Sequence, residues 1–164
     1  MQKVSVKDTH LDYDYNALIT RTKTDKIVIH HTGNPTDDDL SAKEINRSHK
    51  AQGWSCIGYH YVIRKDGTVE QGRPHWTVGA HAYGENYHTI GIHVCGNFEI
   101  GKPTQAQIEA LAMLLANICN DYGLPIDKQH VVAHRDLMPT ACCGKNLYSK
   151  LDTVRGKAIW YQQN

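Results

Sequence analysis

Two histidines and a cysteine in this sequence have the residue types and spacing of a metal-ligand set. His30 lies in the short apolar run of residues 25–33, and His134 ends a second run at residues 130–134. Cys142 follows His134 by eight residues, in a segment that a proline interrupts. Two imidazoles and a thiolate suit zinc, and three protein ligands leave the fourth tetrahedral position open, as in catalytic zinc sites. The pattern predicts one catalytic Zn²⁺ per chain.

Two other interpretations of these residues remain open. A histidine at the end of a strand is more often hydrogen-bonded within the protein than bound to a metal, and short His/Cys spacings also arise by chance. Alternatively, Cys143 beside Cys142 could complete the closed four-ligand set of a structural zinc domain. The five cysteines contain no CxxC pair, so we expect them to be reduced.

The elements that position these residues follow from hydrophobic periodicity and helix capping. Apolar and alternating runs predict strands, the Asp66-Gly67 pair predicts a tight hairpin turn, and capping boxes begin two of the helices. The expected strands are 25–33, the two arms of a hairpin at 57–73, 88–98 and 130–134, and the expected helices are 41–52, 104–123 and 145–162.

This order of strands and helices predicts an α/β fold, with a mixed central β-sheet flanked by helices in a single domain. We expect residues 1–22 to form an N-terminal extension and residues 23–164 to form the domain that carries the zinc site. Ligand sites gather at the ends of neighbouring strands in open sheets, which is where His30 and His134 fall.

Size and composition exclude several classes of protein. The chain has 164 residues, 40% hydrophobic and 21% charged, as is ordinary for one globular domain. Its formal net charge is +1 with scattered Lys and Arg, so no nucleic-acid partner is expected. No apolar run approaches the roughly 20 residues that span a bilayer. The first residues also lack the apolar core of a signal peptide, which predicts synthesis in the cytoplasm without one.

Four segments of the chain carry a resemblance to a known family. They are IVIHHTG (27–33), GWSCIGYHYVIRKDGTVEQGR (53–73), VGAHAYGENYHTIGIHVCGNF (78–98) and AHRDLMPTACCGKNL (133–147). In this order they resemble the zinc-dependent N-acetylmuramoyl-L-alanine amidases of the phage-lysozyme and peptidoglycan-recognition-protein superfamily. The resemblance implies a mixed sheet flanked by helices. It also implies hydrolysis of the amide bond between N-acetylmuramic acid and L-alanine in peptidoglycan.

The resemblance also implies roles for individual residues. His30, His134 and Cys142 match the zinc ligands, and Tyr59 of GYHYVI matches a residue that assists catalysis. Thr140 lies where relatives have lysine or threonine as a second catalytic side chain. Without the resemblance, Tyr59 would be interpreted as an ordinary strand tyrosine. Relatives that bind peptidoglycan without cleaving it typically lack the cysteine ligand, so its presence here favours catalysis.

The chain departs from the family pattern at two cysteines. The usual Cys-Pro-Gly is replaced by Cys142-Cys143-Gly144, which puts a second thiol near the metal site. We assign Cys142 as the ligand from its spacing to His134. Cys56 lies where an acidic or small polar residue is common, and we have no physical account of it.

The substrate cleft is expected to involve His81 and Trp54, although structural roles fit both residues equally well. The leading functional prediction is a lytic amidase, as in a phage or prophage endolysin, acting as a monomer on the bacterial cell wall. The alternatives are a peptidoglycan-binding module without activity and the structural zinc domain. Bound zinc together with hydrolysis would exclude the binding module.

Overall fold

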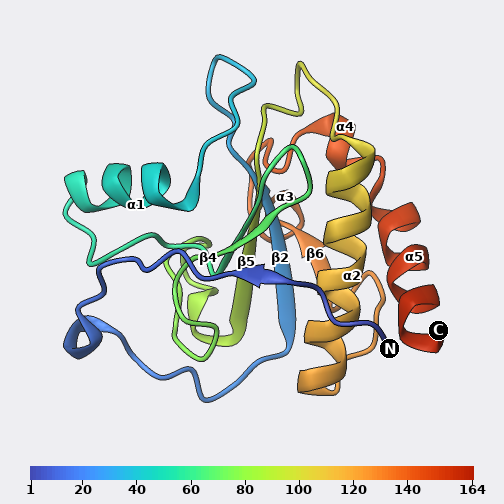
Figure 1. Ribbon diagram of the computed structural model, residues 1–164, viewed down its shortest axis with the longest axis horizontal. Coiled ribbons are helices and arrows are strands. Elements are labelled where there is room, and N and C mark those ends of the chain that lie inside the picture. Colours follow the sequence, from blue (N-terminus) through green and yellow to red (C-terminus); the bar gives the residue numbers. More distant parts are fainter.

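A computed structural model describes residues 1–164 and has one central β-sheet (Figure 1). Its six strands lie in the order β1-β4-β3-β5-β2-β6. The β3–β4 hairpin is antiparallel, and the other neighbouring pairs are parallel, so the predicted mixed sheet is confirmed. The strands are β1 (Val6–Lys7), β2 (Lys26–His31), β3 (Tyr61–Ile63), β4 (Val69–Gln71), β5 (Thr89–Val94) and β6 (Val131–Ala133).

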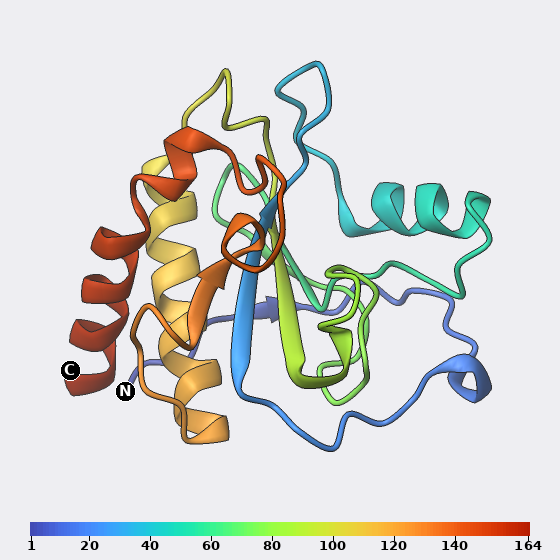
Figure 2. The same ribbon diagram turned by 180° about the vertical axis from the view of Figure 1, so that it is seen from behind.

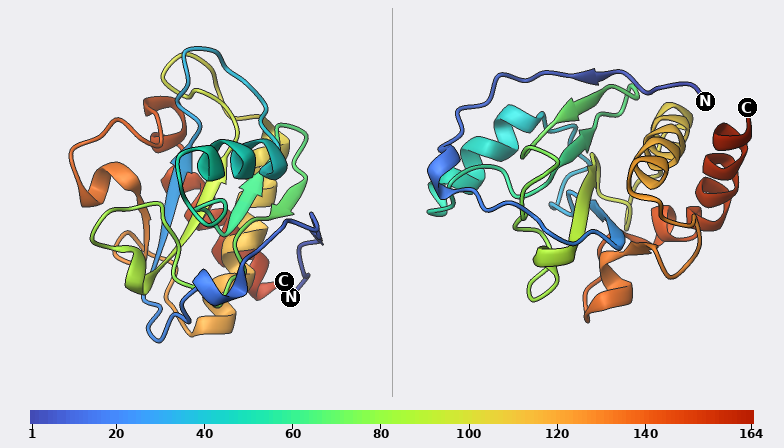
Figure 3. Two further views of the ribbon diagram at one scale, coloured as in Figure 1. Left: turned by 90° about the vertical axis from the view of Figure 1, so that its left-hand side faces the viewer. Right: turned by 90° about the horizontal axis from the view of Figure 1, so that it is seen from below.

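The helices cover the sheet from two sides. Helices α2 and α5 lie side by side against one face, and α1 lies on the opposite side (Figures 1 and 3). None of the helices is both long enough and apolar enough to span a bilayer. The helices are α1 (Ala42–Ala51), α2 (Gln105–Tyr122), α3 (His134–Leu137), α4 (Lys145–Tyr148) and α5 (Leu151–Gln163), with 3-10 turns η1 (Tyr15–Ala17) and η2 (Asn86–His88).

Alternation along the central strands separates the core from the candidate site. Ile27 and Ile29 of β2 and Ile92 of β5 face the large core beneath α2 and α5. Successive side chains of a strand point to opposite faces, so His30 is directed toward the α1 side. His93 of β5 is the register partner of His30 and faces the same way. The alternation therefore places these isoleucines on one face of the sheet and the rings of His30 and His93 on the other.

Local signals set the ends of α1 and α2 as expected. The capping boxes of α1 and α2 are both formed, and Gly123 ends α2 in the left-handed conformation with a φ of 65°. The single helix expected at 145–162 is instead two helices, because α4 ends at Tyr148 and α5 begins at Leu151. At this break the Ser149 hydroxyl donates to the carbonyl of Asn146 at 3.3 Å, a local bond that competes with helix continuation.

The first residues extend the sheet at its edge. Strand β1 pairs in parallel with β4, and the backbone N–H of Val4 donates to Asn117 of α2 at 2.7 Å. Thr20 forms an isolated antiparallel bridge with Thr77. The N-terminal segment therefore packs along the domain from its edge strand to the loop before β5.

A buried histidine next to β3 predicts an acid-sensitive fold. His60 is fully buried, accepts a hydrogen bond from the N–H of Gly91 at 3.0 Å and donates one to the carbonyl of Thr77 at 2.8 Å. Burial lowers the pKa of His60 to about 3. Its stabilising contribution is therefore complete above the unfolded-state pKa of about 6.5 and falls as the pH drops toward 3. We expect this histidine to add a slope of about 1.4 kcal/mol per pH unit to the free energy of unfolding.

Urea unfolding between pH 7 and pH 4, in the presence of a chelator, measures this slope. His60→Gln keeps a side-chain amide that can reach Thr77 but removes the titrating ring, so its slope should be shallower. Equal slopes for the two proteins would contradict the assignment.

Candidate metal and catalytic site

Two parallel strands bring the predicted histidine ligands together. In the register of β2 with β6, Ile29 is paired with Ala133, so His30 and His134 leave the sheet at the same edge. His30 is 1% exposed and His134 is half-buried at the start of α3. Their ring centroids are 4.6 Å apart. The expectation that the two strand ends meet is therefore correct.

The loop after α3 returns the cysteine to this edge. The N–H of Arg135 donates to the carbonyl of Cys142 at 2.7 Å, which holds the loop against α3. Figure 2 shows the segment after β6 folding back beside the end of β2. The sulfur of Cys142 accepts from the N–H of His31 at 3.4 Å and lies 3.6 Å from Nδ1 of His30. One ligand atom from each of His30, His134 and Cys142 lies within 4.8 Å of the others.

This donor set fits a zinc ion. Zinc bonds of about 2.0–2.3 Å in tetrahedral geometry separate neighbouring donor atoms by roughly 3.5 Å, close to the observed sulfur–nitrogen distance. Nitrogen and thiolate donors are also those that zinc prefers. Cys143 is fully buried in the large core and is not part of the cluster. The arrangement therefore offers three protein ligands rather than a closed set of four.

Burial determines the protonation of these donors. It lowers the pKa of His30 well below its usual value and also lowers the pKa of His134, so both are neutral and able to bind a metal at neutral pH. Burial raises the pKa of the Cys142 thiol to about 11. A metal ion binds the thiolate, so binding at this cluster must release a proton.

Tyr59 lies next to the cluster. Its ring centroid is 5.1 Å from that of His30, and the ring stacks on His93 at 4.8 Å with an angle of 24° between the planes. Burial raises the pKa of Tyr59 above its usual value, which keeps the phenol protonated and able to donate. The packing partner His93 was not identified from the sequence, although its alternate position on β5 places it on the site face.

Thr140 and Trp54 lie at the accessible margin of the site. The exposed Thr140 accepts a hydrogen bond from the N–H of Cys142 at 3.3 Å, which places its hydroxyl on the ligand loop. Trp54 is 39% exposed and packs on His49, with ring centroids 4.4 Å apart. His49 in turn lies 5.7 Å from the ring of Tyr59. The ring of His49 thus lies between the indole of Trp54 and the ring of Tyr59.

His81 lies directly behind His30. Its Nδ1 is 2.9 Å from Nε2 of His30, and its Nε2 is 3.1 Å from the hydroxyl of Thr89. Both ring nitrogens therefore have partners within the protein. His81 was expected to line the substrate cleft, and its contacts instead connect a predicted metal ligand to the start of β5.

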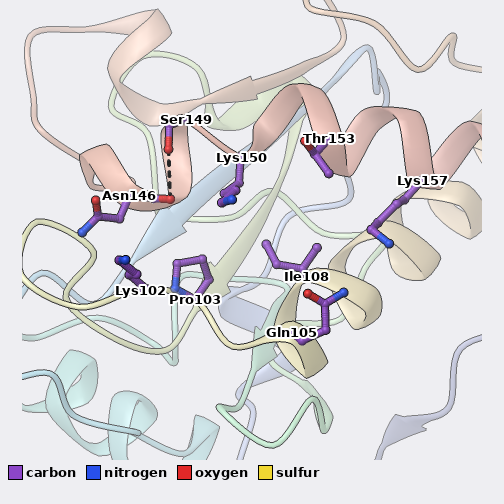
Figure 4. A pocket seen from close by; sticks show the side chains of 9 residues that line it. All are labelled: Lys102, Pro103, Gln105, Ile108, Asn146, Ser149, Lys150, Thr153 and Lys157. Carbon is purple, nitrogen blue, oxygen red and sulfur yellow. Dashed lines mark hydrogen bonds between the residues drawn. The ribbon is translucent and has the colours of Figure 1, made fainter.

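A separate pocket, of about 360 Å³, lies between the start of α2 and the α4–α5 segment (Figure 4). Three lysines, Lys102, Lys150 and Lys157, contribute to its lining, and no member of the histidine cluster does. The three residues that could bind a metal, His30, His134 and Cys142, therefore lie at the strand ends rather than in this pocket.

The fold and the cluster together define a class: small α/β domains with two histidines and a cysteine that could hold a metal ion at the ends of parallel strands. The sequence profile of the N-acetylmuramoyl-L-alanine amidase family matches residues 20–145. The chain belongs to this family.

Individual relatives include both lytic and recognition proteins. The endolysin of Klebsiella phage KP32 is 37% identical over 127 residues, covering 74% of this chain and 82% of the relative. Peptidoglycan-recognition protein SC2 of Drosophila simulans is 35% identical over 132 residues, covering 77% and 71%. The solved structure of the endolysin and N-acetylmuramoyl-L-alanine amidase LysCS from Clostridium intestinale superposes with a TM-score of 0.82 at 32% identity, covering 93% and 95% of the two chains.

Proposed function

We propose that this protein is an N-acetylmuramoyl-L-alanine amidase that cleaves peptidoglycan in the bacterial cell wall, as an endolysin does. The bond cleaved is the amide between the lactyl group of N-acetylmuramic acid and the L-alanine that begins the stem peptide. The observation that carries the proposal is the cluster of His30, His134 and Cys142 beside Tyr59, in a chain of this family.

The three donors would hold one zinc ion. Bound at a site with an open position, zinc makes water a nucleophile near neutral pH and polarises the carbonyl of a scissile amide. The N–H of His31 donates to the sulfur of Cys142, which stabilises the thiolate that such a site needs. The hydrogen bond from the N–H of Arg135 to the carbonyl of Cys142 holds the loop so that the sulfur faces the two imidazoles.

Three further side chains contact the substrate in this proposal. The neutral Tyr59 hydroxyl donates a hydrogen bond to the oxygen that becomes negatively charged as the amide carbon turns tetrahedral. Its ring is held in place between His30 and His93. Thr140 is uncharged and exposed on the ligand loop, where its hydroxyl can orient the carbonyl or the attacking water. We propose Trp54 as a surface for a sugar ring at the margin of the cleft.

A peptidoglycan-binding module without activity is the second candidate, because recognition proteins are among the relatives. The complete donor set argues for catalysis, since a module that only binds needs no cluster of thiol and imidazoles. A structural zinc domain would need a fourth protein ligand, and Cys143 is buried away from the cluster.

Turnover of purified peptidoglycan before and after EDTA, with zinc added back, tests the proposal. The readout is release of new L-alanine amino termini rather than of reducing sugar. We expect EDTA to stop the release and zinc to restore it. Binding of peptidoglycan by the zinc-loaded protein with no release of alanine termini would instead support the binding module.

A further inference from the structure

The hydrogen bonds of His81 are not explained by the proposed reaction. This residue lies between β4 and β5, outside the three-residue cluster, and its ring is perpendicular to that of His30 with centroids 5.0 Å apart. It contacts His30 on the nitrogen opposite the one that faces Cys142, since Nε2 of His30 meets His81 and Nδ1 meets the sulfur.

The network assigns the proton positions. The hydroxyl of Thr89 donates to the carbonyl of Glu85 at 2.9 Å, so its oxygen can only accept from Nε2–H of His81. A neutral His81 protonated at Nε2 has a lone pair at Nδ1, and this nitrogen accepts from Nε2–H of His30. Nδ1 of His30 is then left unprotonated, facing the cysteine sulfur. In this way each hydrogen bond from Thr89 through His81 to His30 has one donor and one acceptor.

The surroundings of the His81 ring are shaped to hold it in one position. A Cβ atom at Gly91 would lie 2.5 Å from Cγ of His81, and one at Gly79 would lie 2.8 Å from Cδ2. The side-chain oxygen of Asn86 accepts from the backbone N–H groups of both His81 and Ala82, each at 2.9 Å. The two glycines thus leave room for the His81 ring beside His30, and Asn86 holds the backbone of His81 in place.

We propose that His81 is a positioning residue for the metal site, which holds His30 in the Nε2–H tautomer so that Nδ1 is the metal ligand. The inference rests on the proposed function for the identity of the metal as zinc. It replaces the expectation that His81 contacts substrate, because neither ring nitrogen is free to do so. Partners that fix the tautomer and orientation of a ligating histidine typically contribute about 10–100-fold to metal affinity.

Direct measurement of zinc affinity, by competition with a chromophoric chelator, tests the inference without using activity. His81→Leu removes the acceptor for His30, and we expect zinc affinity to fall by about 10–100-fold. In His81→Asn the side-chain oxygen can stand in for Nδ1, so part of the affinity should return. Thr89→Val removes the anchor of His81 and should cause a smaller loss. His75→Leu, at an exposed ring outside the site, is the matched control and should bind zinc as the wild type does.

The wild-type protein provides a second readout that needs no folded variant. Long-range ¹⁵N–¹H correlation spectra report which ring nitrogen carries the proton, and we expect the proton of His30 on Nε2. A proton on Nδ1 of His30, or unchanged zinc affinity in a folded His81→Leu protein, would overturn the inference. Failure of the proposed function would look different. The wild-type protein would bind zinc tightly and the His81→Leu variant would bind it more weakly, but the wild type would release no alanine termini.

Discussion

Replacing Cys142 with serine is expected to reduce the rate of alanine release by about 10³-fold or more, because the chain then lacks the thiolate that completes the zinc site. The fold should persist, since Cys142 is half-buried in a loop and belongs to neither strand nor helix. Three measurements on the same preparation separate the loss of metal from the loss of structure. Atomic absorption gives the zinc content, circular dichroism reports the fold, and peptidoglycan turnover reports the activity.

The neighbouring cysteine supplies the matched control. Cys143→Ala removes an adjacent thiol that is buried in the core, so the variant should lose some stability while keeping one zinc per chain and its turnover. Full activity in Cys142→Ser, or loss of zinc in Cys143→Ala with Cys142 intact, would show that the wrong sulfur has been assigned.

We expect the second large loss of activity when the hydroxyl of Tyr59 is removed. Tyr59→Phe keeps the ring that packs between His30 and His93, so the fold and the zinc affinity should not change. A lost oxyanion donor typically costs about 10²–10³-fold in kcat, and KM should change little because the interaction forms only in the transition state. Steady-state kinetics on a soluble muramyl peptide, with zinc content checked, measure this split.

Tyr87→Phe provides the comparison for Tyr59, because Tyr87 is 59% exposed and should tolerate the change without kinetic effect. If Tyr59→Phe raised KM alone, the hydroxyl would contribute to binding rather than to the reaction. A wild-type kcat in that variant would remove Tyr59 from the proposed mechanism.

The parts of the site that the sequence predicted are those fixed by strands. Period-two alternation and the ends of apolar runs placed His30 and His134 at one edge of the sheet, because parallel neighbours in register end together. The hairpin turn at Asp66-Gly67 and the capped starts of α1 and α2 were also correct, since each depends on a few adjacent residues.

The parts that sequence reasoning missed depend on loops and on packing between distant segments. The loop that carries His81 has no periodicity, so nothing local indicated that its ring would lie behind His30. The burial of Cys143 beside a half-buried Cys142 depends on how the returning loop meets the core. The break between α4 and α5 lies in a stretch whose composition suits a continuous helix. The boundary expected between residues 22 and 23 remains a prediction.

Strand β6 forms the end of the sheet and has only three residues, all of them paired with β2. The proposed ligands bracket this pairing: His30 extends from one strand, His134 from the other, and Cys142 is 112 residues from His30 along the chain. A bound ion would therefore act as a removable cross-link at this short edge of the sheet. Zinc at 1,000 times its dissociation constant would raise the free energy of any opening that separates the ligands by about 4 kcal/mol. Metal loading and protection of the β6 amides from hydrogen exchange should then rise together, as two measures of one equilibrium.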